Sequence, residues 1–133
     1  MRPKQVITKI LLPGLGLLLI LWACNTPSIP MPPPSPESFT FIQSAQTGYY
    51  ELEISANQYI PEGAEVMVKN LDTGLFVGGP AGAGGAYHSM PFAAELDDII
   101  QVSFVTDSGE GGVTCLVLGN IDGTPDEDPR CGD

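Results

Sequence analysis

A few side chains could support catalysis. His88 is the only histidine of the 133-residue chain, so a histidine-activated serine nucleophile could be built only around it. Ser89 follows directly, and neighbouring residues of a β-strand point to opposite faces. Asp97 and Asp98 are an adjacent carboxylate pair, but acid–base catalysis needs carboxylates that converge and differ in pKa. We therefore expect His88 at the surface or in a turn, both aspartates in a turn, and no enzyme activity.

The acidic C-terminal tail could bind calcium, which takes six to eight oxygen ligands. Asp122, Asp126 and Asp128 are weak candidate ligands. An EF-hand loop fails here, because Leu118 and Pro129 would stand at its first and last ligand positions. We expect a solvated, irregular tail with no metal or cofactor, and a calcium site of another geometry is the alternative.

The segment 74–85 has six glycines in 12 residues. No Lys-Ser or Lys-Thr follows it and no helix is expected after it, so it does not fit a phosphate-binding loop. We expect a long flexible hairpin connection. The alternative is a mobile binding loop at one end of the domain.

The charge of the chain excludes some partners. The net charge is −11, but from Cys24 onward two basic and 16 acidic residues give a side-chain charge of −14. Such a body repels phosphate backbones, so we expect no nucleic-acid partner. It also lacks a basic face that could bind anionic lipid by charge alone.

The elements that must position these residues are strands. Apolar residues alternate with polar ones from Ser38 to about Ile121, and turn residues interrupt the pattern. The last alternating series is Val113, Cys115 and Val117. Six or seven short strands in this length predict an all-β fold, a small antiparallel sandwich of two sheets. The expected core residues are Phe39, Phe41, Tyr49, Leu52, Ile54, Val66, Val68, Phe92, Ile100, Val102 and Phe104.

One stretch carries a family resemblance. Residues 59–74, Tyr-Ile-Pro-Glu-Gly-Ala-Glu-Val-Met-Val-Lys-Asn-Leu-Asp-Thr-Gly, resemble bacterial immunoglobulin-like and carboxypeptidase-regulatory-like modules. The similarity covers roughly residues 48–109, and Asp97 stands where the family has Gly. The resemblance implies an immunoglobulin-like sandwich used as a spacer, adhesion or assembly module on bacterial surfaces, without catalytic residues.

The N-terminus reads as an export signal. A basic start leads into an apolar run, residues 10–22, that is short for a bilayer about 30 Å thick but typical of a signal peptide. Leu21-Trp22-Ala23-Cys24 resembles the lipobox of bacterial lipoproteins, which implies cleavage before Cys24 and lipidation of its thiol. Asn25 stands where an Asp favours inner-membrane retention in some bacteria, so the outer membrane is slightly favoured.

We therefore divide the chain into four parts. Residues 1–23 are the signal peptide, 24–37 the lipidated Cys24 with a Pro-rich linker, 38–121 the sandwich, and 122–133 the acidic tail. Six prolines among residues 25–37 predict extended polyproline II, a tether of roughly 30 to 40 Å. A ligand for a partner's aromatic groove is the alternative reading of this segment.

The remaining cysteines, Cys115 and Cys131, form an even pair in an exported chain, which suggests a disulfide that pins the tail. We expect a module anchored to a membrane through lipid on Cys24, on the periplasmic or cell-surface side of a bacterial envelope. Its role would be structural or interaction with an envelope protein. The alternative is ligand- or calcium-dependent adhesion through the Gly-rich segment or the tail.

Overall fold

The computed structural model describes residues 31–129, and the predicted signal peptide, Cys24 and Cys131 lie outside this range. The described part of the chain consists of strands, short 3-10 turns and connecting loops. The elements in chain order are η2 (Pro36–Ser38), β1 (Phe39–Gln43), β2 (Tyr49–Ile54), β3 (Glu65–Asn70), β4 (Phe76–Pro80), η3 (Ala83–Gly85), β5 (Tyr87–His88), β6 (Phe92–Ala93), β7 (Ile99–Thr106), β8 (Gly109–Val117) and β9 (Asp126–Glu127).

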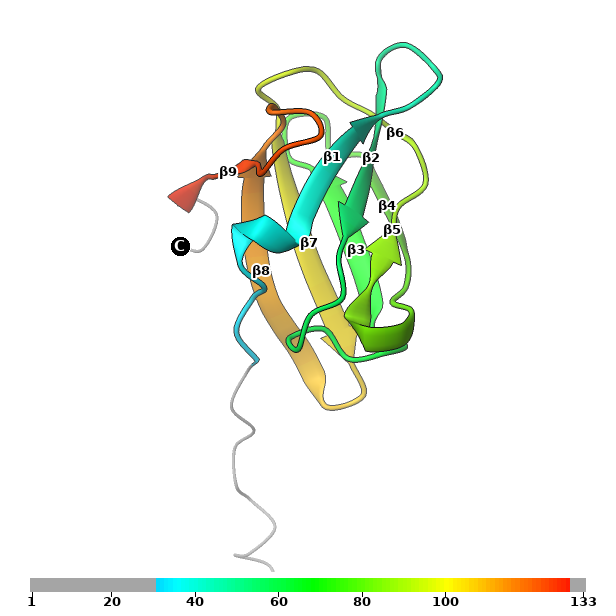
Figure 1. Cartoon of the computed structure of the whole chain (residues 1–133), viewed down its shortest axis with the longest axis vertical. Helices are drawn as coiled ribbons and strands as arrows, with labels where there is room; N and C mark the ends of the chain where they lie inside the picture. The colour runs from blue at the N-terminus through cyan, green and yellow to red at the C-terminus, as the bar shows by residue number, and fades with distance from the viewer. Residues whose placement is uncertain (1–30, 130–133) are drawn as a thin grey trace, which may run out of the picture.

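The strands form two antiparallel sheets (Figure 1). In sheet A, β1 pairs with β2, and the other edge of β2 pairs with the short strands β5 and β6. Sheet B has the order β4-β3-β7-β8-β9. The predicted all-β fold, a small antiparallel sandwich of two sheets, is confirmed.

The core lies between the sheets and follows the period of two that the sequence shows. Every expected core residue is buried except one. Tyr50, not Tyr49, faces the core, because side chains two apart on a strand share a face and Leu52 and Ile54 are both buried. The expectation for Tyr49 is wrong by one position, and its side chain is only half-buried.

Strand β8 also presents the opposite face from the one expected. Thr114 and Leu116 pair with the core residues of β7 and are buried, whereas Val113 is 43% exposed. Residues directly opposite one another in a sheet share a face, so the pairing with β7 decides which side of β8 enters the core. Cys115 is buried as well, on the outer face of sheet B opposite Gln101.

The Gly-rich segment 74–85 is not one long loop. It contains β4, which pairs along its whole length with β3, and the turn η3. Two glycines are required by close packing: a Cβ on Gly78 would lie 2.8 Å from the Val66 carbonyl oxygen, and one on Gly85 would collide with the Ile60 carbonyl. These glycines therefore let the backbone pack closely.

The C-terminal part of the predicted tether packs on the body. Pro34 is buried, and a Cβ on Gly112 of β8 would collide with Pro33, so the proline segment lies directly against this strand. Figure 1 shows the segment running beside β8 toward the end of the sandwich that carries the β7–β8 turn. The length available as a free spacer is therefore shorter than the whole linker.

The acidic tail is more ordered than expected. Asp126 and Glu127 form β9 against Val117 and Leu116, and the Asp128 amide donates to the Cys115 carbonyl (2.8 Å). Pro125 is buried. Part of the tail thus adds a strand to sheet B.

Candidate functional site

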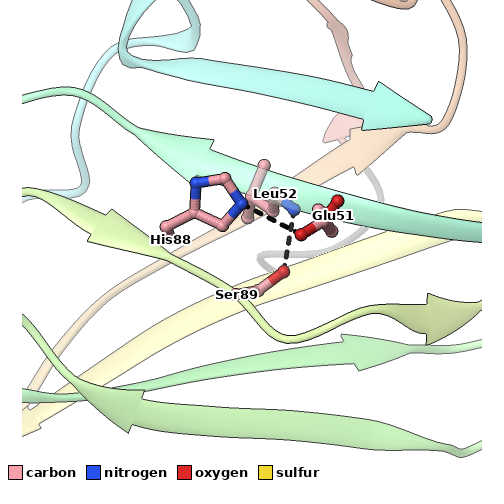
Figure 2. A network of polar contacts seen from close by, with 4 residues as sticks. All are labelled: Glu51, Leu52, His88 and Ser89. Atoms are coloured by element: carbon pink, nitrogen blue, oxygen red, sulfur yellow. Dashed lines mark hydrogen bonds and ion pairs between the residues drawn. The ribbon is translucent and has the colours of Figure 1, made fainter. Parts of the chain in front are cut away.

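The side chains of His88 and Glu51 are in hydrogen-bond contact on the outer face of sheet A. His88 Nε2 lies 3.1 Å from Glu51 Oε1, and the His88 side chain is 52% exposed (Figure 2). His88 of β5 is the register partner of Glu53, and Glu51 lies two residues earlier on the same face of β2, so it is a diagonal neighbour of His88. An exposed pair of this kind contributes little to stability, about 0 to 1 kcal/mol. His88 is thus a surface residue, as its sequence context predicts.

Ser89 is buried whereas His88 is exposed, as expected for adjacent residues of an extended chain, and the Ser89 hydroxyl bonds the Leu52 amide (Figure 2). Its Oγ accepts a hydrogen bond from the Leu52 amide (2.8 Å), and its own amide donates to the Leu52 carbonyl (2.8 Å). Ser89 is only 3% exposed and joins β2 to the chain between β5 and β6. The Ser89 hydroxyl therefore takes the place of a backbone carbonyl as the acceptor for the Leu52 amide.

A polar network closes one end of the sandwich. The buried Asn70 donates through Nδ2 to Asp98 Oδ2 (2.8 Å) and accepts from the Asp72 amide (2.9 Å). Asp98 Oδ2 also accepts from the Glu95 amide (2.9 Å), and Asp72 Oδ2 accepts from the Ile99 amide (2.8 Å). The network fixes the β3–β4 turn against the loop before β7.

Asp97 and Asp98 have different roles in the loop before β7. Asp98 faces Asn70, while Asp97 has φ 73°, the left-handed conformation that glycine adopts most easily. A shallow depression of about 450 Å³ lies over this end and is lined by Gly48, Asp72, Thr73, Ala93, Ala94, Glu95 and Asp98. Two of its carboxylates, those of Asp72 and Asp98, bond backbone and amide groups, and this arrangement positions loops.

Tyr87 is a titratable group whose pKa is altered by its surroundings. Burial raises the pKa of the Tyr87 phenol above its ordinary value, and the negative charge of Glu65 raises this pKa further. Both effects disfavour the phenolate. Tyr87 lies in the core beside Gly79 of β4, so the shift reflects packing between the two sheets.

The calcium candidates are spread along the tail. Asp122 has φ 64° and donates its amide to the Phe41 carbonyl (3.0 Å), Asp126 lies on β9, and Asp128 is 7% exposed. Between residues 31 and 129, no group of three or more His, Cys, Asp or Glu side chains is placed to hold a metal ion. The calcium site therefore stays a weak prediction.

Two of the three cysteines lie outside the described residues. Cys115 is buried on β8, and residues 31–129 contain no second cysteine. The pairing of Cys115 with Cys131 stays a prediction, and so does the lipidation of Cys24.

The sequence reasoning missed three polar residues that the structure buries: Asn70, Ser89 and Thr114. Asn70 follows a strand and precedes Asp-Thr-Gly, a pattern typical of a side chain that caps a turn. Ser89 and Thr114 have no comparable local signal, because their partners or neighbours come from distant strands.

In the part of the chain that the structure describes, no helix has the length and apolar character needed to cross a membrane. Comparison of the chain with family models, curated proteins and solved structures found no match in any of the three.

Proposed function

We propose that the chain is a lipid-anchored structural or protein-interaction module of a bacterial envelope and performs no catalysis. The proposal rests on Leu21-Trp22-Ala23-Cys24, placed at the end of a basic and then apolar leader. Two or three acyl chains on Cys24, at about 0.8 kcal/mol per buried methylene, would anchor it durably. We place the body on the periplasmic or cell-surface side, with the outer membrane slightly favoured.

The arrangement of the described residues supports this role. The sandwich begins at Phe39, directly after the proline segment, so little chain separates the proposed anchor from the folded body. The proline segment runs along β8 toward the β7–β8 turn (Figure 1). The opposite end, with the loops 44–48, 71–74 and 94–98, would then face away from the membrane.

The polar side chains also support a role without catalysis. The Ser89 hydroxyl bonds the Leu52 amide rather than the His88 ring, and Asp98 bonds Asn70. A nucleophile needs a base within hydrogen-bond reach, and these groups instead hold strands and loops in place.

The immunoglobulin-like resemblance gains support from one backbone angle. Asp97, which stands where the family pattern has Gly, has φ 73°. Aspartate tolerates this left-handed conformation better than most residues, so the departure keeps the turn that glycine would make. We propose an immunoglobulin-like or carboxypeptidase-regulatory-like module that acts by binding or spacing.

Metabolic labelling with radioactive palmitate tests the anchor. We expect the wild-type chain to take up label and the Cys24→Ser variant to take up none. The Cys131→Ser variant is the matched control and should be labelled like the wild type, with immunoblots confirming equal amounts of protein. Equal labelling of Cys24→Ser and wild type would refute the proposal.

A further inference from the structure

The four edges of the two sheets are protected to different degrees. In sheet A, the outer side of β1 is bonded by the Asp122 amide, and the opposite edge consists of the two-residue strands β5 and β6. In sheet B, β9 has two residues, both acidic. Shortness, charge and covering segments are the usual means of preventing strand edges from pairing with other chains. Strand β4 lacks these protections apart from Pro80 at its end, because it is five residues long and uncharged.

The register of β4 shows which backbone groups it offers. Asn70 N bonds Leu75 O and Ala81 N bonds Ala64 O, so the odd-numbered residues of β4 bond to β3. The amides of Phe76 and Gly78 therefore point outward, and no backbone partner for them occurs among residues 31–129. Pro80 has no amide but offers its carbonyl. The edge can accept one further extended strand.

The side chains of this edge suit a second copy of the same strand. We propose that two copies of the chain pair antiparallel through β4, with Gly78 opposite Gly78 and Phe76 opposite Pro80. Gly78 places no side chain at the dyad. Phe76, 63% exposed in the single chain, would cover the proline ring of the other copy. About four backbone hydrogen bonds would form. Because Pro80 has no amide hydrogen, the Phe76 carbonyl opposite it is the only outward group that gains no new partner.

The charges beside β4 are self-complementary in this arrangement. Lys69 lies opposite Phe76, and Glu65 lies opposite Pro80. Across the antiparallel pair, Phe76 and Lys69 of one copy then line up with Pro80 and Glu65 of the other copy. Each such line of residues has a lysine at one end and a glutamate at the other. Like charges are kept apart, although the body as a whole is acidic.

The small size of the contact predicts weak association. One added strand of five residues buries less than the roughly 1,200 Å² of a standard stable interface. We therefore expect a dissociation constant on the order of 10 to 100 µM, which matters mainly where copies are concentrated. Residues 31–129 of each chain offer one such edge, so pairing through it ends at two copies. The inference deepens the interaction role proposed above by naming its partner.

Sedimentation velocity and hydrogen exchange of the full chain in mild detergent, from about 5 to 500 µM, test the pairing. We expect a monomer to become a dimer, with the Phe76 and Gly78 amides protected only at the higher concentration. Phe76→Glu should weaken the dimer at least tenfold. Leu96→Glu, which changes a 60% exposed leucine in the loop before β7, should change it less than twofold.

A monomer at every concentration, exchange of the two amides that does not depend on concentration, assemblies larger than two, or equal effects of both variants would each overturn the inference. Unchanged melting temperatures of both variants would show that they fold. None of these readouts uses the lipid on Cys24, so the pairing and the proposed anchor can fail separately.

Discussion

Thr114 offers the sharpest test of the core. Its Oγ1 is the one buried side-chain nitrogen or oxygen among residues 31–129 that has no hydrogen-bond partner. The side chain is 3% exposed and lies opposite Val102 between the sheets. The perturbation is Thr114→Val, which replaces this hydroxyl by a methyl group of similar size.

The expected gain follows from the cost of the buried hydroxyl. Mutational data place the cost of burying such a group without a partner at about 1 to 3 kcal/mol. Thr114→Val removes this cost and keeps a β-branched side chain suited to a strand. We expect the free energy of unfolding to rise by about 1 to 2 kcal/mol. For a domain of this size, each kcal/mol raises the melting temperature by about 4 to 8 °C.

Thermal melts followed by circular dichroism, together with urea unfolding at constant m-value, measure the change. The matched control is Thr40→Val on β1, whose half-buried side chain faces away from the core. We expect this control to stay within about 0.5 kcal/mol of the wild type. An unchanged or lower stability of Thr114→Val would refute the reasoning, because the hydroxyl would then have a partner such as a buried water.

Three further predictions concern the site residues. Ser89→Ala leaves the buried Leu52 amide without its partner and should lower the free energy of unfolding by about 1 to 3 kcal/mol, whereas the exposed control Ser55→Ala should change it by less than about 0.5 in the same melts. The pKa of Tyr87 is raised in the folded state, so its contribution to stability is complete below the ordinary tyrosine value of about 10 and is lost as the pH rises through the folded pKa. Unfolding measured from pH 8 to 11 should therefore show a smaller alkaline loss for Tyr87→Phe than for wild type, and equal losses would contradict this. Millimolar calcium should leave the melting temperature unchanged, because the three tail acids do not come together, and a clear rise would show a site after all.

The sequence correctly predicts which face of a strand is buried where apolar residues occupy only every second position. Phe39 and Phe41 alternate with polar residues, and both are buried as expected. The prediction fails where adjacent residues are both apolar, as at Tyr49 and Tyr50, because either one could face the core. From Val113 to Leu118 the face is likewise decided by the pairing with β7, which no local pattern encodes.

The site residues show the same limit. Asp98 was expected in a turn and is found there, but its bond to Asn70 joins residues 28 positions apart. The strand within the Gly-rich segment was missed because glycine disfavours strands. Here close approach to Val66 outweighs that local preference.

The path of the proline segment has a mechanical consequence. The segment lies beside β8 and continues through η2 into β1, so a pull on the proposed anchor would reach β1 at its N-terminal end (Figure 1). The five register pairs between β1 and β2, from Phe39 with Ile54 to Gln43 with Tyr50, would then be loaded together in shear. Hydrogen bonds that share a load must break at once rather than one after another. The proposed attachment through residues before Phe39 would therefore load the first strand in the direction in which it resists extraction best.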